Sequence, residues 1–272
     1  MPNQEMIKGG EWTSSGDAAR PRQAAEWQAP CQDEQRRRRR QPGMVEAMSR
    51  KSFERWSMDA RRRSLLEATL DCVAEHGMRG ASARRVAERA GVTAGLIRHY
   101  FGSRDAMVRD AYGYLMGQLT GEAAASSEQG GEAPARRLAN FIVANVTEPN
   151  VSSRKVALWS TFIGCVRTEG DFADIHRESY REFLTLLETL IHPVFVAHER
   201  PADPVACQHY AIALNGLIDG LWMEGGLGHG LYDNALLPMI ALGAAEGILA
   251  LPSNTLRQYF ADQYPPSRLA KT

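Results

Sequence analysis

The most informative segment of this chain is residues 82–104, with the sequence S-A-R-R-V-A-E-R-A-G-V-T-A-G-L-I-R-H-Y-F-G-S-R. Ser82 is a typical helix N-cap, because its hydroxyl accepts a hydrogen bond from a free backbone N–H group. Gly91 and Gly102 can each end a helix, since glycine adopts the left-handed conformation without strain. Thr93 follows the first of them and can cap the next helix. The pattern predicts two short helices joined by a tight turn, a helix-turn-helix.

The second predicted helix has residue types that suit contact with DNA. In a helix-turn-helix this helix enters the major groove, while the first helix crosses the backbone. Its first turn consists of small residues that allow close approach to base edges, and its end carries Arg98, His99 and Tyr100, which can reach phosphates or bases. The residues expected to contact DNA are Ser82, Thr93, Ala94, Gly95, Leu96, Arg98, His99, Tyr100 and Arg104.

Basic residues flank the motif. Arg84, Arg85 and Arg89 lie in or beside the first helix and can hold phosphates. A plain helical hairpin within a larger helical protein is the alternative interpretation. The coincidence of caps, glycines and basic residues favours DNA binding.

The motif A-x-R-A-G-V-T-x-G-x-I-x-x-Y-F-x-S-R, residues 87–104, resembles the signature of the TetR family of one-component repressors. The resemblance spans roughly residues 59–119. It implies an all-α fold with a three-helix DNA-binding head and a C-terminal helical domain that binds a ligand and dimerises. Arg104 replaces the usual lysine, and Arg98 stands where the family has tyrosine. We therefore expect Arg98, rather than a tyrosine, to touch DNA at that position.

Composition excludes several classes of protein. The chain has 272 residues, 44% of them hydrophobic, which indicates a globular protein. It has neither an apolar run of the roughly 18 residues that a membrane span needs nor the apolar core of a signal peptide, so we expect a cytoplasmic protein without a membrane partner. The four cysteines form no C-x-x-C pair, and no hydrolase, P-loop or dinucleotide motif occurs. No cofactor, metal or enzymatic activity is predicted.

Charge is unevenly distributed along the chain. The net charges of residues 1–57, 58–120 and 121–272 are +3, +3 and −6. Residues 1–58 are predicted to be a disordered basic extension, because they lack apolar periodicity. The run Arg36–Arg40 can grip phosphates or can be idle, and both interpretations stay open. Met44, Met48 and Met58 are alternative translation starts.

Helices are predicted throughout the rest of the chain. A first helix over 59–76 ends at Gly77, and a third helix of the head runs from Ser103 to Leu119. A loop is expected over 121–132. Gly225 and Gly226 are expected to stop the penultimate helix. The domains predicted are a head over 59–119, a helical effector-binding and dimerisation domain over 120–252, and a flexible tail over 253–272. Expected helix starts in the second domain are Pro134, Ser152 or Ser153, Asp171, Asp203 with Pro204, and Asp233.

The last two predicted helices are apolar around most of their circumference, more than surface helices of a monomer usually are. Residues 241–247, A-L-G-A-A-E-G, are small and allow helices to approach closely. These features predict a homodimer through a four-helix bundle of the last two helices of each copy. Such a dimer fits double-stranded DNA with a palindromic operator.

The second domain also resembles the BetI-type branch of the family, repressors of choline oxidation to glycine betaine, in L-W-S-T-F at 158–162 and N-G-L-I-D-G-L-W at 215–222. Aromatic rings bind quaternary ammonium groups such as choline by cation–π attraction, and Asp219 or Glu224 can add a counter-charge. The effector-binding residues predicted are Phe141, Trp159, Phe162, Tyr180, Phe183, Asp219 and Trp222. Alternatively, the rings fill a core. Two other functions stay open: a DNA-binding regulator without an effector, and a helical enzyme or carrier that does not bind DNA.

Overall fold

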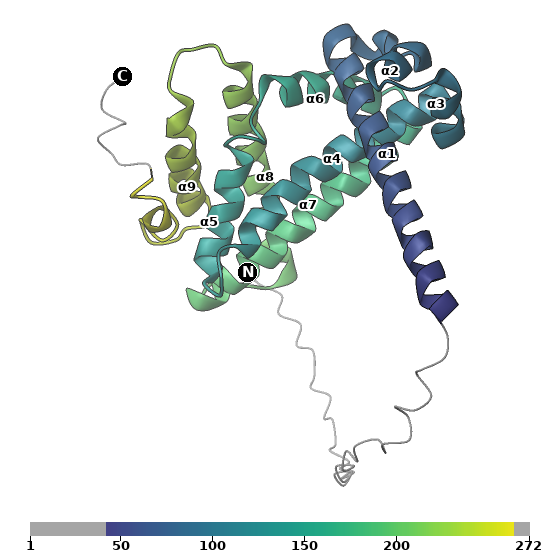
Figure 1. Ribbon diagram of the computed structural model, residues 1–272. Coiled ribbons are helices and arrows are strands. Elements are labelled where there is room, and N and C mark those ends of the chain that lie inside the picture. Colours follow the sequence, from purple (N-terminus) through teal and green to yellow (C-terminus); the bar gives the residue numbers. More distant parts are fainter. Residues whose placement is uncertain (1–41, 264–272) are drawn as a thin grey trace, which may run out of the picture. The chain divides into compact units, whose positions relative to one another are not determined.

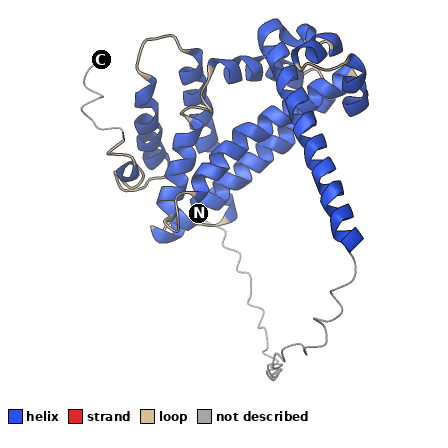
Figure 2. Cartoon of the chain, in the orientation of Figure 1, coloured by secondary structure: helices blue, strands red, loops and turns tan. Residues whose placement is uncertain are grey.

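The computed structural model describes residues 42–263, with side chains described for 58–263. In that part of the chain all regular structure is helical (Figure 2). A compact unit begins at Glu54 and contains the helices described next. The predicted head comprises most of α1 (Pro42–Gly80), α2 (Ala83–Arg89) and α3 (Ala94–Phe101). The rest of the unit contains α4 (Arg104–Glu128), α5 (Pro134–Asn145), α6 (Ser153–Val166), α7 (Gly170–Ala197), α8 (Pro204–Leu227) and α9 (Leu237–Ile248).

The head forms as its caps and apolar spacing predict. The face of α1 expected to be apolar is buried, namely Leu65, Leu66, Thr69, Leu70 and Val73. Gly77 has φ 67° and interrupts the helical geometry of α1 at the predicted end. The Ser82 hydroxyl accepts a hydrogen bond from the Arg85 N–H at 3.3 Å. Gly91 and Gly102 adopt positive φ, as expected. Thr93 has N-cap backbone geometry, but its side chain makes no capping bond.

The second domain is built around two long helices, α4 and α7, which pack side by side and run in the same direction, with Arg109 beside Asp171 and Tyr112 beside His176 (Figure 1). Helices α5, α8 and α9 share one core with α7, and its central buried side chains are Phe141, Leu187, Ile191, Phe195, Leu214 and Leu242. The start of α6 joins this domain to the head. Arg154 contacts Asp71 of α1 at 2.6 Å, and Lys155 contacts Glu122 of α4 at 2.8 Å.

Two predicted helix ends are wrong. The predicted loop over 121–132 is mostly helix, because α4 continues to Glu128. Ala123 and Ser127 are buried on this part of α4, and the Asn140 side chain of α5 donates to the Ser126 carbonyl at 3.1 Å. Helix α8 likewise continues through Gly225 and Gly226 and ends at Gly228.

The glycine pair serves close packing rather than termination. A Cβ atom at Gly225 would lie 2.9 Å from a methyl group of Val151 and 2.7 Å from one of Leu237, and a Cβ at Gly226 would clash with Val156. Because glycine has no side chain, α8 can approach α6 and the segment before it at this point.

Two predicted helix starts need correction. Helix α7 begins after Glu169, and Asp171 lies in its first turn, where it pairs with Arg109 at 2.7 Å. The Asp233 side chain caps a short 3₁₀ turn, η2 (Asn234–Leu236), and α9 starts only afterwards. Pro193 lies inside α7, which continues to Ala197.

The two predicted flexible ends are also corrected where the structure describes them. Residues 42–58 belong to α1 and are helical rather than disordered. Residues 253–263 are folded and include the 3₁₀ turn η3 (Arg257–Tyr259), with Leu256 and Phe260 buried. The buried Glu246 carboxylate accepts hydrogen bonds from the backbone N–H groups of Asn254, Leu256 and Arg257 at 2.8–3.1 Å. The Arg36–Arg40 run and the residues after 263 lie outside the described part.

Candidate functional site

Helix α3 presents one face to solvent and anchors the other in the head. Ile97 and Phe101 are buried, whereas Leu96 and Tyr100 are half-buried. The exposed members of the predicted DNA-contact set are Thr93, Ala94, Gly95, Arg98 and His99. The small first turn is therefore open to close approach, as a groove-reading helix requires.

The arginines of the head divide into two groups. Arg84 and Arg98 are exposed and have no hydrogen-bond or ion-pair partner among the described residues. Arg85 donates to the Gly80 carbonyl at 3.0 Å, and Arg89 pairs with Asp71 and Glu75. Arg104, predicted to touch DNA, donates instead to the Ala81 carbonyl at 3.2 Å and to the Met78 carbonyl. The guanidinium groups of the second group hold the head together.

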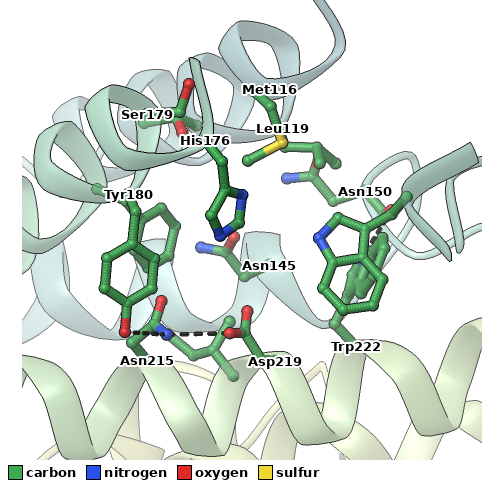
Figure 3. A pocket seen from close by; sticks show the side chains of 14 residues that line it. Met116, Leu119, Asn145, Asn150, His176, Ser179, Tyr180, Asn215, Asp219 and Trp222 are labelled. Atoms are coloured by element: carbon green, nitrogen blue, oxygen red, sulfur yellow. Dashed lines mark hydrogen bonds between the residues drawn. The ribbon is translucent and has the colours of Figure 1, made fainter. Parts of the chain in front are cut away.

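A cavity of about 130 Å³ lies within the second domain, between α4, α6, α7 and α8 (Figure 3). It is small beside the roughly 300–1,000 Å³ of common ligand sites. Its lining residues are Met116, Leu119, Thr120, Asn145, Asn150, Trp159, His176, Ser179, Tyr180, Phe183, Asn215, Ile218, Asp219 and Trp222.

Five of the seven predicted effector residues line this cavity, namely Trp159, Tyr180, Phe183, Asp219 and Trp222. The Trp159 and Trp222 rings meet edge to face with centroids 5.9 Å apart. Phe141 and Phe162 do not line it and are fully buried. Phe141 packs against Phe183, and Phe162 stacks on Tyr112 with centroids 4.9 Å apart. Periodicity identified their apolar face but could not separate cavity-facing from core-facing positions.

Asp219 is the only acidic residue that lines the cavity in the described part of the chain. Its carboxylate accepts a hydrogen bond from the Asn215 amide at 2.9 Å and has no basic partner among the described residues. Although Asp219 keeps access to solvent, partial desolvation beside the cavity raises its pKa, and the Asn215 hydrogen bond opposes that shift. Glu224, the alternative counter-charge, lies outside the cavity and contacts His229 at 3.0 Å and Tyr232 at 3.1 Å.

The polar cavity residues other than Asp219 and Tyr180 were not predicted from the sequence. His176 contacts the hydroxyl of buried Tyr112 through Nδ1 at 2.9 Å, and burial lowers its pKa. Asn145 and Asn150 also line the space. His176 precedes Tyr180 by four residues, so helical spacing already placed both on one face of α7.

Comparison with known proteins agrees with this architecture. Residues 65–111 match the family described as "Bacterial regulatory proteins, tetR family". Residues 134–250 match "BetI-type transcriptional repressor, C-terminal". A curated relative, the HTH-type transcriptional regulator BetI 1 of Chromohalobacter salexigens, is 32% identical over 167 residues, which cover 61% of this chain and 79% of the relative. The chain belongs to the TetR family, in its BetI-type branch.

Solved structures agree with this TetR-family assignment. A transcriptional regulator from Pseudomonas aeruginosa PAO1 has a TM-score of 0.63 and 27% identity, covering 74% of this chain and 94% of that one. A regulator from Saccharomonospora viridis in complex with choline has a TM-score of 0.56 and 18% identity, covering 67% of this chain and 94% of that one. At that identity the second likeness concerns the fold alone. The protein is thus a transcriptional regulator with a helix-turn-helix DNA-binding domain.

Neither a membrane span nor a metal cluster is found in the described residues. None of the helices there is long and apolar enough to cross a membrane. Within the same residues, no group of three or more histidine, cysteine or acidic side chains is arranged to hold a metal ion.

Proposed function

We propose that this TetR-family regulator is a homodimeric repressor that binds a palindromic operator through α3 and is released by a small quaternary ammonium compound such as choline. Cavity occupancy would release DNA by favouring a conformation in which the two recognition helices no longer match successive grooves. The ligand can shift that equilibrium only by its difference in affinity between the two forms.

One observation carries the effector class: the Asp219 carboxylate lies among aromatic rings without a basic partner in the described residues. Asp219 is still accessible to solvent in the single chain, but its partial desolvation disfavours the charged carboxylate, so a cation beside it would be favourable. Trp159, Tyr180 and Trp222 offer ring faces that attract a cation, and an alkylated ammonium group loses little hydration when it enters such a site. The small cavity favours a compact ligand. The S. viridis regulator of the same fold was solved with choline, which supports this class.

Exposed apolar side chains on the last two helices support the dimer. Val205 and Leu227 of α8 are 61% and 60% exposed, and Ile212, Met223 and Ile240 are also exposed. Several exposed apolar side chains on neighbouring helices are what an interaction surface would present. A two-fold axis through α8 and α9 would bury these side chains against their copies.

The proposal is tested by titrating the full-length protein onto its own upstream DNA at two salt concentrations, with and without choline. We expect saturable, salt-sensitive binding that choline weakens. Asp219→Asn should bind the DNA like the wild type but resist release. Glu224→Gln, which changes a carboxylate outside the cavity on the same helix, is the matched control and should still be released. Binding that choline and a panel of other ammonium compounds leave unchanged would contradict the effector assignment.

A further inference from the structure

The cavity has two chemically different walls. Figure 3 shows His176 reaching in from α7, while Asn215 and Asp219 stand on α8 opposite. The Asp219 side suits a cation, as proposed above. His176 is not needed for that role, because a histidine does not attract an ammonium group.

Tyr112 determines which nitrogen of His176 carries the proton. The Tyr112 side chain is fully buried, and its hydroxyl contacts Nδ1 of His176 at 2.9 Å. Burial raises the pKa of Tyr112 to about 12, so the phenol keeps its hydrogen near neutral pH. A buried hydroxyl without an acceptor is costly. The Tyr112 O–H therefore donates its hydrogen bond to Nδ1 of His176, which accepts it. Neutral histidine then carries its proton on Nε2 and offers it as a donor.

The other nitrogen donors of the lining are mostly engaged. The amides of Asn145, Asn150 and Asn215 donate to the Phe141 carbonyl, the Ala144 carbonyl and the Asp219 carboxylate at 2.9, 3.1 and 2.9 Å. The Trp222 indole donates to the Asn150 carbonyl at 2.9 Å. Among the ring nitrogens of this lining, only Nε2 of His176 and Nε1 of Trp159 make no hydrogen bond within the described residues.

We infer that His176 determines effector specificity and that the effector carries a hydrogen-bond-accepting oxygen beside its ammonium group. This inference rests on the proposed function. Asp219 and the rings hold the cationic end, and the fixed N–H of His176 receives a hydroxyl or carboxylate oxygen of the same molecule. An alkylammonium ion without oxygen fills only half of the site and leaves the His176 donor without an acceptor.

The test compares three probes by isothermal titration calorimetry with the full-length protein: tetramethylammonium, choline and glycine betaine. The wild type should bind at least one of the two oxygen-bearing compounds about tenfold more tightly than tetramethylammonium. The double variant Tyr112→Phe with His176→Phe removes the donor without leaving the hydroxyl unpaired. It should lose this preference while its affinity for tetramethylammonium stays within about twofold.

Trp159→Phe is the matched control, because it keeps a ring but removes the other unpaired N–H. Because the Trp159 ring belongs to the proposed ammonium site, the affinity for all three probes can fall together, but the preference should be retained. Equal wild-type affinity for all three probes would overturn the inference and leave the ammonium proposal intact, as would a preference that persists in the double variant. A preference lost in Trp159→Phe would also overturn it. If the double variant fails to fold, the wild-type comparison still tests the inference. If the wild type binds no probe, the proposed effector class fails as well.

Discussion

At the scale of single residues, the charged side chains that matter are those left without a partner. Arg98 on α3 and Asp219 in the cavity have no opposite charge beside them among the described residues, whereas Arg89 and Arg104 are held inside the head. From the sequence, both Arg98 and Arg104 were predicted to contact DNA. The structure separates them, because only packing reveals which guanidinium group already has acceptors.

Arg98 is expected to read bases, so Arg98→Ala should weaken operator binding by about tenfold or more and reduce the preference for operator over random DNA. Electrophoretic mobility shift with both DNAs checks this. Arg84→Ala is the matched comparison. It should lower the affinity for operator and for random DNA by the same factor, as loss of a phosphate contact does. Unchanged operator affinity in Arg98→Ala would contradict the placement of α3 in the groove.

Asp219 predicts how effector binding depends on pH. Its pKa is raised in the free protein, and a bound cation favours the ionised form, so the pKa falls on binding. Affinity for choline should therefore be full at pH values above the raised pKa of Asp219. It should decrease as the pH falls through that pKa, because a protonated Asp219 must lose its proton before it can pair with the cation. Protonation of His176 would act in the same direction. Calorimetry from pH 8 to about pH 5 measures this, and affinity that rises on acidification would be the contrary result.

At the scale of elements, local signals predicted helix starts better than helix ends. The Ser82, Ser103 and Asp203 caps and Pro134 are where the sequence placed them, because capping is a short-range interaction. The predicted C-terminal ends of α4 and α8 were wrong. Their glycine- and serine-rich segments resemble turns, but burial against α5 and α6 keeps them helical. Tertiary packing outweighs weak propensity at such places.

The C-terminal segment depends on one carboxylate. Glu246→Ala should lower the free energy of unfolding by about 2–4 kcal/mol, since several buried backbone N–H groups and Arg257 lose their acceptor. Urea unfolding at equal protein concentrations checks this. Glu182→Ala, an exposed position on α7, is the control and should change stability by less than about 0.5 kcal/mol. Similar stability of both variants would mean that residues 253–263 contribute little.

At the scale of the whole molecule, the proposed function requires two copies to act together. One head reads one half-site, and a palindrome needs a second head at a set spacing. The exposed apolar side chains of α8 and α9 are the surface that can supply this pairing. Their apolar character was visible in the sequence, but their exposure was not.

Ile212→Glu combined with Ile240→Glu should convert the protein to monomers and abolish tight operator binding, because burying two pairs of like charges opposes association. Sedimentation velocity and mobility shift measure the two effects. Val196→Glu changes an equally exposed residue of α7 and should leave both unchanged. A double variant that stays dimeric would place the interface elsewhere.

The sequence by itself determined the all-helical class, the helix-turn-helix and five of the cavity residues, because caps, glycines and helical spacing are local properties. Only the tertiary structure decided that Phe141 and Phe162 belong to the core, that Arg104 braces the head, and that His176 and the asparagines enter the cavity. Each of those outcomes depends on which helix packs against which face. A pairing between distant segments is set by the sum of all contacts rather than by neighbours in the chain.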